Sequence, residues 1–237
     1  MWRPRRKLAV SAPDIVGSIE VTAGAERFWL LPQLAAYWPR TKTLLIADAH
    51  LGKAAAFRKA GVPVPAGTTE TNLRGFSGLI RAVCAERIVF LGDLIHSTAA
   101  RNAAGAAFIR WREQHAEVEM VLVRGNHDRN AGDPPCEWGV TCVDEPFVID
   151  GIALAHFPQP VQGRYAIAGH MHPAAHLTGR GRESMRLPCF YFTPGYAILP
   201  AFGAFTGMAD VSPTPEDRIY VVADAQVLEV TGALVDE

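Results

Sequence analysis

Five short segments of this 237-residue chain carry most of the side chains that can bind a metal ion. Each segment follows an apolar run that reads as a β-strand. The segments are Asp48-Ala49-His50, Gly92-Asp93, Gly125-Asn126-His127-Asp128, His156 and Gly169-His170-Met171-His172. Two divalent ions held about 3.5–4 Å apart can clamp the attacking and the leaving oxygen of a phosphoryl transfer, and these side chains are enough to hold two. The residue types therefore predict two-metal phosphoester chemistry.

Taken singly, the segments are weak signals. Asp48 and His50 can leave a strand on the same side, but surface pairs of this kind are common. Asp93 alone would serve as a helix cap, and a lone His156 is more often a packed core or turn residue. The joint occurrence, in this order and always after a strand, favours a metal site. In that company Asp93 is the natural bridging ligand, because a carboxylate has one oxygen for each ion.

The elements that must position these residues alternate between strands and helices. Apolar runs predict strands over 43–47, 87–91 and 118–123, and helical spacing predicts helices over 69–85 and 103–115. This order implies parallel strands joined by right-handed crossovers. Ligands in open α/β sheets bind beyond the carboxyl ends of the strands. Each segment is expected there, on the loop that follows its strand.

The second half of the chain has a different pattern. Short strand-like runs separated by turn residues cover 147–149, 152–155, 165–168, 189–192, 219–222 and 227–230. They predict an antiparallel sheet, and the early runs 18–21 and 27–31 predict a hairpin. We therefore expect an α/β fold in which a two-sheet β-sandwich is flanked by helices, formed by a single domain over residues 1–237.

Composition and charge narrow the class of protein. A net charge of −1 gives no global basic field for nucleic acid. Local basic clusters are Arg3, Arg5, Arg6 and Lys7, then Lys53, Arg58 and Lys59, then Arg180, Arg182 and Arg186. The amino-terminal apolar run is too short for a signal peptide, and no stretch reaches the ~18 apolar residues of a membrane span. The scattered cysteines Cys84, Cys136, Cys142 and Cys189 favour a reduced, cytoplasmic protein.

Together the segments resemble the signature of the calcineurin-like metallophosphoesterase superfamily, which runs D-x-H, G-D, G-N-H-[DE], H and G-H-x-H. The match spans residues 43–173 and fills every metal-ligand position. The resemblance implies a four-layer fold. It also implies one ion on Asp48, His50, Asp93 and His172, and a second ion on Asp93, Asn126, His156 and His170. His127 would lie beside the phosphate and protonate the leaving oxygen, while Asp128 would orient its loop.

Further segments are similar to one branch, the bacterial ligase-associated DNA damage response endonucleases. These segments are 48–57, 61–65, 169–173 and 200–207. His96 stands where many phosphatases of the superfamily have an aspartate. It resembles the histidine of double-strand-break repair nucleases that assists the acid histidine, and a supporting hydrogen bond to His127 explains it equally well. The run 200–207 is expected to pack as a Gly-rich turn against the site.

The resemblance implies a metal-dependent phosphodiesterase that acts on DNA in repair, as an endonuclease on single strands. Mixed oxygen and nitrogen ligands suit Mn²⁺, Fe or Zn²⁺, and we favour Mn²⁺. Lys53, Arg58 and Arg124 are candidates to hold backbone phosphates. The near-neutral charge argues for modest affinity or for a partner, such as a DNA ligase or another repair protein, that delivers the DNA. Two alternatives stay open: an enzyme for small nucleotide-type phosphoesters, and a non-catalytic scaffold.

Overall fold

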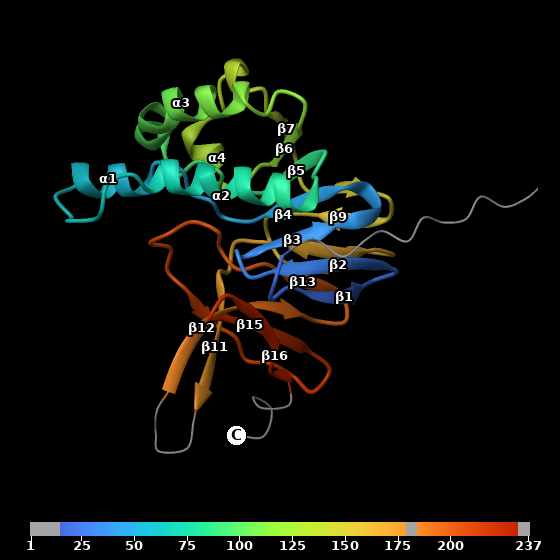
Figure 1. Cartoon of the computed structure of the whole chain (residues 1–237). Helices are drawn as coiled ribbons and strands as arrows, with labels where there is room; N and C mark the ends of the chain where they lie inside the picture. Colours follow the sequence, from blue (N-terminus) through green and yellow to red (C-terminus); the bar gives the residue numbers. More distant parts are fainter. Residues whose placement is uncertain (1–14, 179–183, 232–237) are drawn as a thin grey trace, which may run out of the picture.

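Two β-sheets packed face to face form the centre of the molecule, and the α-helices lie on the outer side of the first sheet (Figure 1). This computed structural model describes residues 15–178 and 184–231. The basic residues Arg3, Arg5, Arg6, Lys7, Arg180 and Arg182, singled out in the sequence, lie outside the described residues.

The first sheet holds seven strands in chain order. They are β1 (Ile19–Ala23), β2 (Glu26–Leu31), β3 (Ala35–Trp38), β4 (Thr43–Ile46), β5 (Arg87–Leu91), β6 (Glu119–Val123) and β7 (Thr141–Val143). Strands β1 to β4 pair antiparallel, and β4 to β7 pair parallel. The predicted hairpin and the three predicted parallel strands are present. Strands β3 and β7 were not predicted, because each is short and β3 is buried throughout, so neither alternates between apolar and polar residues.

Helices connect the parallel strands and cover the outer face of this sheet. Helices α1 (Lys53–Lys59) and α2 (Thr68–Val83) join β4 to β5, α3 (Thr98–Glu113) joins β5 to β6, and α4 (Asn126–Ala131) follows β6. Single turns of 3-10 helix lie at η1 (Pro39–Thr41) and η2 (Cys136–Trp138). Helix α3 begins at Thr98 rather than at residue 103, because the hydroxyl of Ser97 accepts the Ala100 N–H and caps the helix. Its alanine-rich first turns carry no apolar spacing that would reveal it.

The second sheet is mixed, so the prediction of an antiparallel sheet is wrong. Its strands are β8 (Phe147–Ile149), β9 (Ile152–Leu154), β10 (Tyr165–Ala168), β11 (Pro173–Thr178), β12 (Ser184–Phe192), β13 (Tyr196–Ile198), β14 (Ala209–Asp210), β15 (Arg218–Ala223) and β16 (Gln226–Glu229). The order is β14-β11-β12-β13-β10-β9-β8, and β15 pairs with β12 and β16. Strand β10 runs parallel to both β9 and β13, and β11 runs parallel to β14. Residues 155–164 return the chain from the carboxyl end of β9 to the edge of the sheet where β9 began. Strand β10 starts there, so β9 and β10 run parallel.

Two large apolar cores hold the layers together. One lies between the first sheet and the helices and includes Phe76, Phe108 and Trp138. The other lies between the sheets and includes Trp38 and Phe190. The predicted α/β fold of two packed sheets with flanking helices is therefore confirmed. In the described part of the chain every α-helix precedes residue 132, so the layers there are helices, sheet and sheet rather than the predicted four.

Cys84, Cys136, Cys142 and Cys189 are all free, as the absence of a paired spacing predicted. Among the residues that the structure describes, no helix has the length and apolar character needed to cross a membrane.

Candidate metal centre

The predicted ligand residues all come from the carboxyl ends of strands, and the two sheets bring those ends together. Asp48, Asp93 and Asn126 follow β4, β5 and β6 of the first sheet, while His156 and His170 follow β9 and β10 of the second. Hydrogen bonds join the two sheets at this point. The His170 N–H donates to Asp48 Oδ2 over 2.8 Å, and His156 Nδ1 donates to the Leu91 carbonyl over 3.1 Å.

The ligand atoms of the predicted residues form two clusters, and a third group, His50, His96 and His127, shares His50 with the first of them. The Asp48 cluster consists of Asp48, His50 and His172, and the Asp93 cluster consists of Asp93, His156 and His170; within each, the ligand atoms lie within 4.8 Å of one another. Asn126 joins the second group, because its Oδ1 lies 2.9 Å from His156 Nε2. All the residues that the sequence assigned to two ions are therefore brought together, in the same two groups.

Asp93 lies between the clusters with one oxygen turned toward each. Its Oδ2 is 3.9 Å from His50 Nε2, and its Oδ1 is 3.6 Å from His156 Nε2. The backbone N–H of His127 donates to Oδ1 over 2.9 Å and holds the carboxylate in this orientation. A bridging carboxylate requires this placement.

His127 and His96 lie beside Asp93 and outside the two clusters. His127 Nδ1 donates to the backbone carbonyl of His96 over 2.9 Å, which leaves Nε2 directed at the site, 3.9 Å from Asp93 Oδ2. The two imidazole rings stack with centroids 4.9 Å apart. The supporting hydrogen bond considered for His96 is thus made by its main chain and not by its side chain. These residues lie at the start of α4 and just before α3, so the expectation that every motif sits in a loop is wrong for Asn126 and His127.

Five of the ligand positions have a left-handed backbone that residues other than glycine seldom adopt. The φ angles are 51° at Asp48, 43° at His50, 50° at Asp93, 70° at His170 and 48° at His172. Each such residue costs about 1–3 kcal/mol, and strain of this kind collects at functional sites. The surrounding fold holds these side chains at a cost in stability, which argues that their placement serves function and not folding.

The glycine of each motif makes room for a ligand. An added Cβ would lie 2.1 Å from His156 Nδ1 at Gly92, 2.2 Å from Asp93 Oδ1 at Gly125 and 2.6 Å from Asp48 Oδ2 at Gly169. All three distances are far inside van der Waals contact. The G-D, G-N-H and G-H pairings of the sequence therefore have a steric reason.

Several residues outside the motifs hold the ligands in place. Buried Asp128 accepts the N–H groups of Ile95 and Gly125, which agrees with the loop-orienting role expected of it. Glu145 Oε2 accepts the N–H groups of His156 and Phe157. Sequence reasoning missed Glu145, and its position in a turn-rich stretch gives no signal that would have found it.

Asn72 and Gly207 also support the Asp48 cluster. Asn72 Nδ2 donates to the Ala49 carbonyl between Asp48 and His50, and the Gly207 carbonyl accepts a hydrogen bond from His172 Nδ1 over 2.8 Å. A signal for Asn72 did exist, because it is a polar residue on the apolar stripe of α2. The run 200–207 packs against the site as expected, since the Gly203 N–H also donates to the Asp48 carbonyl.

Burial keeps most of these histidines neutral and therefore able to bind metal. Burial lowers the pKa of His50 to about 2 and that of His96 to about 4, and it lowers the pKa of His156 and His170 as well. Burial alone would lower the pKa of His172 too, but the Asp48 carboxylate 3.4 Å away raises it above its ordinary value. Burial raises the pKa of Asp93 to about 7.

The donor set fits divalent cations. Asp48 Oδ1 and His50 Nδ1 are buried and have no hydrogen-bond partner among the described residues. Among the described residues neither Asp48 nor Asp93 forms an ion pair with a Lys or Arg, and two buried carboxylates are costly unless positive charge compensates them. Mixed carboxylate, amide and imidazole donors suit Mn²⁺, Fe or Zn²⁺ better than Mg²⁺, which prefers oxygen ligands alone.

The three cations predicted to hold substrate differ in their surroundings. Lys53 begins α1, and its ammonium lies 5.9 Å from the centre of the Phe57 ring. Burial lowers the pKa of Lys53, although the nearby carboxylates of Asp93 and Asp48 act to raise it. Arg58 donates to the Pro65 carbonyl. Arg124 makes two 2.7 Å hydrogen bonds to Asp133 and lies 3.4 Å from Asp144. A substrate phosphate would have to displace Asp133 from Arg124.

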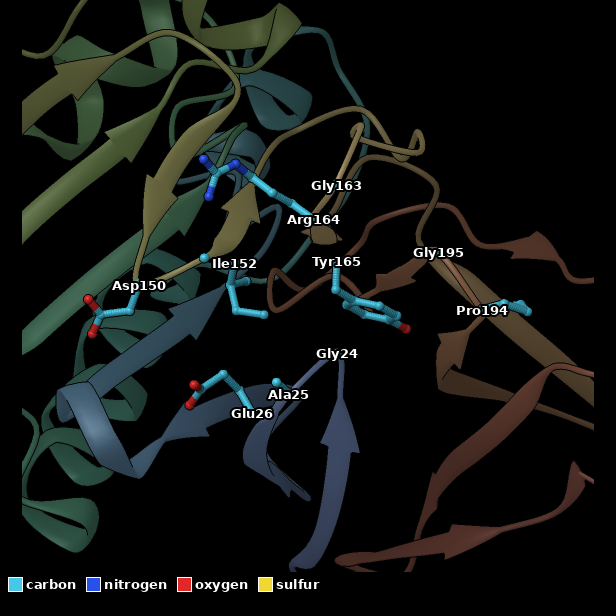
Figure 2. Close-up of a pocket in the computed structure, with 11 residues that line it drawn as sticks. Gly24, Ala25, Glu26, Asp150, Ile152, Gly163, Arg164, Tyr165, Pro194 and Gly195 are labelled. Atoms are coloured by element: carbon cyan, nitrogen blue, oxygen red, sulfur yellow. The ribbon is translucent and has the colours of Figure 1, made fainter.

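A separate cavity of about 400 Å³ lies at the other end of the second sheet (Figure 2). Ile152 and Tyr165 line it at the amino ends of β9 and β10, whereas His156 and His170 follow the carboxyl ends of these strands. Its acidic residues Glu26 and Asp150 both bind Arg40. The cavity therefore stands apart from the metal-binding residues.

Comparisons with solved structures place this chain beside a nuclease. The crystal structure of the nuclease MPE of Pseudomonas putida matches with a TM-score of 0.79 and 39% sequence identity, over 90% of this chain and 100% of that chain. Yfce, a phosphoesterase from E. coli, matches with a TM-score of 0.40 and 15% identity over 81% of this chain and 98% of that chain. No protein-family model and no curated protein sequence matches.

Proposed function

Since the chain belongs to the same family as the nuclease MPE and carries the motifs of calcineurin-like metallophosphoesterases, we propose that it hydrolyses DNA phosphodiester bonds. The chain is a metal-dependent phosphoester hydrolase with buried Asp and His clusters. The observation that carries the proposal is the position of Asp93, which directs one oxygen at each cluster. A non-catalytic scaffold would not need to retain all seven ligand residues, five of them in strained backbone.

In this proposal the two clusters would each hold one ion. Asp48, His50, His172 and Asp93 would hold one of them, and Asn126, His156, His170 and Asp93 would hold the other. When bound, two such ions activate water for attack on phosphorus and stabilise charge on the phosphate oxygens. Mn²⁺ is the proposed metal, because the donors mix oxygen with nitrogen.

The remaining residues bind the phosphate and move protons. His127 Nδ1 is occupied by the His96 carbonyl, so Nε2 is the atom that carries a proton to the leaving oxygen. His96 stacks on His127 and fixes the plane of its ring. Lys53 and Arg58 would bind neighbouring phosphates; Arg124 would join them only after releasing Asp133.

We further propose that the substrate is single-stranded DNA cut internally, that the enzyme acts in DNA repair in the cytoplasm, and that a DNA ligase or another repair protein delivers the DNA. These proposals rest on the similarity of segments 48–57, 61–65, 169–173 and 200–207 to the ligase-associated endonucleases, on the scattered cysteines and on the net charge of −1. We propose that residues 1–237 form one domain, because the two sheets share one core and one site.

Circular single-stranded DNA tests the central proposal. Purified protein with Mn²⁺ should convert the circle to linear and then shorter strands, and the Asp93→Ala variant prepared in the same way should leave it intact. An intact circle together with rapid hydrolysis of cyclic nucleotides would instead support the alternative of a small nucleotide substrate.

A further inference from the structure

Exposed apolar side chains gather around the metal-binding residues. Nine large apolar side chains are exposed among the described residues, and four of them lie on the segments that carry or contact the histidines of the two clusters. These four are Phe157, Met171, Phe205 and Met208. A rim of this kind beside a polar site is costly in water and marks a binding surface.

Phe157 lies against the Asp93 cluster. Its ring centroid is 4.4 Å from that of His170 and 4.9 Å from that of His156, and 37% of the residue remains exposed. Its backbone N–H donates to Glu145 Oε2, which fixes the residue next to the site. Phe157 therefore presents a held aromatic surface and not a mobile one.

Phe205 belongs to a segment that is bound to the Asp48 cluster. The segment 203–208 that carries it is joined to Asp48 by the Gly203 N–H and to His172 by the Gly207 carbonyl. A cavity of about 120 Å³ separates part of this segment from His172, with Thr206 and Met208 in its lining. The segment thus borders the site directly.

The backbone of Phe205 carries a second sign of function. Its φ is 60°, a left-handed conformation that is an outlier for a bulky residue, and the residue is 44% exposed. The ring is thus held outward by strained backbone instead of being packed in a core. Strain of this kind persists where a particular side-chain placement is used.

We propose that Phe157 and Phe205 stack on the nucleobases that flank the phosphate bound between the two clusters. The inference rests on the proposed function and names the substrate groups that the same site recognises. The Phe157 ring borders the Asp93 cluster, and the segment of Phe205 is bound to the Asp48 cluster. A strand with its phosphate between the clusters would therefore have one aromatic residue near each neighbouring base. Aromatic rings bind bases of any sequence, since every base has a π-face.

The charges near the site explain why base contacts are needed. The Arg124 guanidinium is already balanced by Asp133 and Asp144, and the net charge of the chain is −1. Of the three cations proposed to hold phosphates, only Lys53 and Arg58 are then free of a carboxylate partner, and base contacts would add to the affinity that phosphate contacts usually supply. Stacking also requires bases that are free of a duplex, which selects strands with unpaired nucleotides at the cleavage position.

Binding measurements test this inference apart from cleavage. The full-length protein with Mn²⁺ is mixed with phosphorothioate oligonucleotides, which resist hydrolysis. The fluorescence anisotropy of each labelled oligonucleotide is recorded to measure its affinity for the protein. One oligonucleotide carries 2-aminopurine on either side of a central linkage, and a second has abasic residues at those two positions. Wild-type protein should quench 2-aminopurine fluorescence and bind the base-containing strand about tenfold more tightly than the abasic one.

Leucine and tyrosine variants separate stacking from general apolar contact. Phe157→Leu and Phe205→Leu should each lose quenching and reduce the preference to less than about threefold, while the corresponding tyrosine variants should restore both. Leu228→Ala, an equally exposed apolar residue on β16, serves as the control and should behave as wild type.

Equal binding of the two oligonucleotides by wild type, or a preference that survives both leucine variants, would overturn the inference. The circular-DNA assay reads the proposed function independently. If the circle is cut but the protein binds both oligonucleotides equally, only the stacking inference is refuted. If the protein prefers the base-containing oligonucleotide but leaves the circle intact, only the proposed DNA hydrolysis is refuted.

Discussion

Asp93 is the residue whose single side chain reaches both candidate ion positions. Asp93→Ala should therefore lower metal content in both clusters, and activity should fall by about 10³-fold or more, since charge stabilisation at the phosphate is lost. Elemental analysis of the desalted protein, together with phosphodiesterase rates, measures both effects. Asp150→Ala changes an exposed aspartate at the far cavity and should leave metal content and rate unchanged.

His127 should behave differently, because its imidazole lies outside both clusters. His127→Ala is expected to retain its metal ions and to lose about 10²–10⁴-fold in turnover, the usual contribution of an acid–base group. The same elemental analysis and rate measurement check this. A variant that lost its metal together with its activity would show that His127 is a ligand instead.

At the scale of the elements, the glycines between strand ends and ligands set the geometry. Gly125→Ala should displace Asp93, because the new Cβ would lie 2.2 Å from Oδ1. The backbone at Gly125, with φ −86° and ψ 178°, is one that alanine adopts readily, so the effect is steric alone. We expect a loss of about 1–3 kcal/mol in the free energy of unfolding and weaker metal binding.

Urea denaturation and metal titration measure these two losses. Gly105→Ala is the matched control, since Gly105 lies inside α3 with no atom within 4 Å of the added Cβ. That change should raise the free energy of unfolding by about 0.5–1 kcal/mol, the difference between the helix propensities of alanine and glycine. An unchanged metal affinity in Gly125→Ala would contradict the steric argument.

The sequence predicts the elements and the ligands to different degrees, for physical reasons. The predicted parallel strands of the first sheet and the ends that carry Asp48 and Asp93 follow from local hydrophobic runs, which a single sequence displays. Strand β3 and the start of α3 were not predicted. Strand β3 is buried on both faces, so its residues do not alternate, and the first turns of α3 consist of small residues without apolar spacing. The parallel pairing of β9 with β10 depends on how residues 155–164 return, which no local pattern encodes.

The same distinction applies to the site. Residue types at strand ends indicate that Asp93 and His156 bind metal, but they do not reveal the partners that hold them. Glu145, which holds His156, and Asp133, which binds Arg124, lie 11 and 9 residues along the chain from these partners, and neither belongs to a motif. Such contacts are properties of the packed chain and are read only from the structure.

At the scale of the whole molecule, protons and metal ions compete for the same buried groups. The pKa of His50 falls from its ordinary 6.5 to about 2, so the unfolded chain binds more protons below pH 6.5 and the metal-free protein loses stability as the pH falls. His96, His156 and His170 act in the same direction. Asp93 acts in the opposite direction, because its pKa rises from 3.8 to about 7 and its contribution is lost as the pH rises through this range.

Metal binding requires ionised Asp93 and neutral histidines, so its stabilising effect must grow with pH. A ligand whose free concentration is about 100 times its Kd adds about 2.7 kcal/mol to the free energy of unfolding for each site. Asp93, whose pKa is raised to about 7, is partly protonated near neutral pH, and the Asp48 carboxylate raises the pKa of His172. The gain in Tm from Mn²⁺ should therefore be larger at about pH 8 than at about pH 6. Thermal denaturation with and without Mn²⁺ at both pH values measures the gain. In Asp93→Ala the gain should be small at either pH, and an equal gain at both pH values in the wild type would mean that the ions bind away from these buried groups.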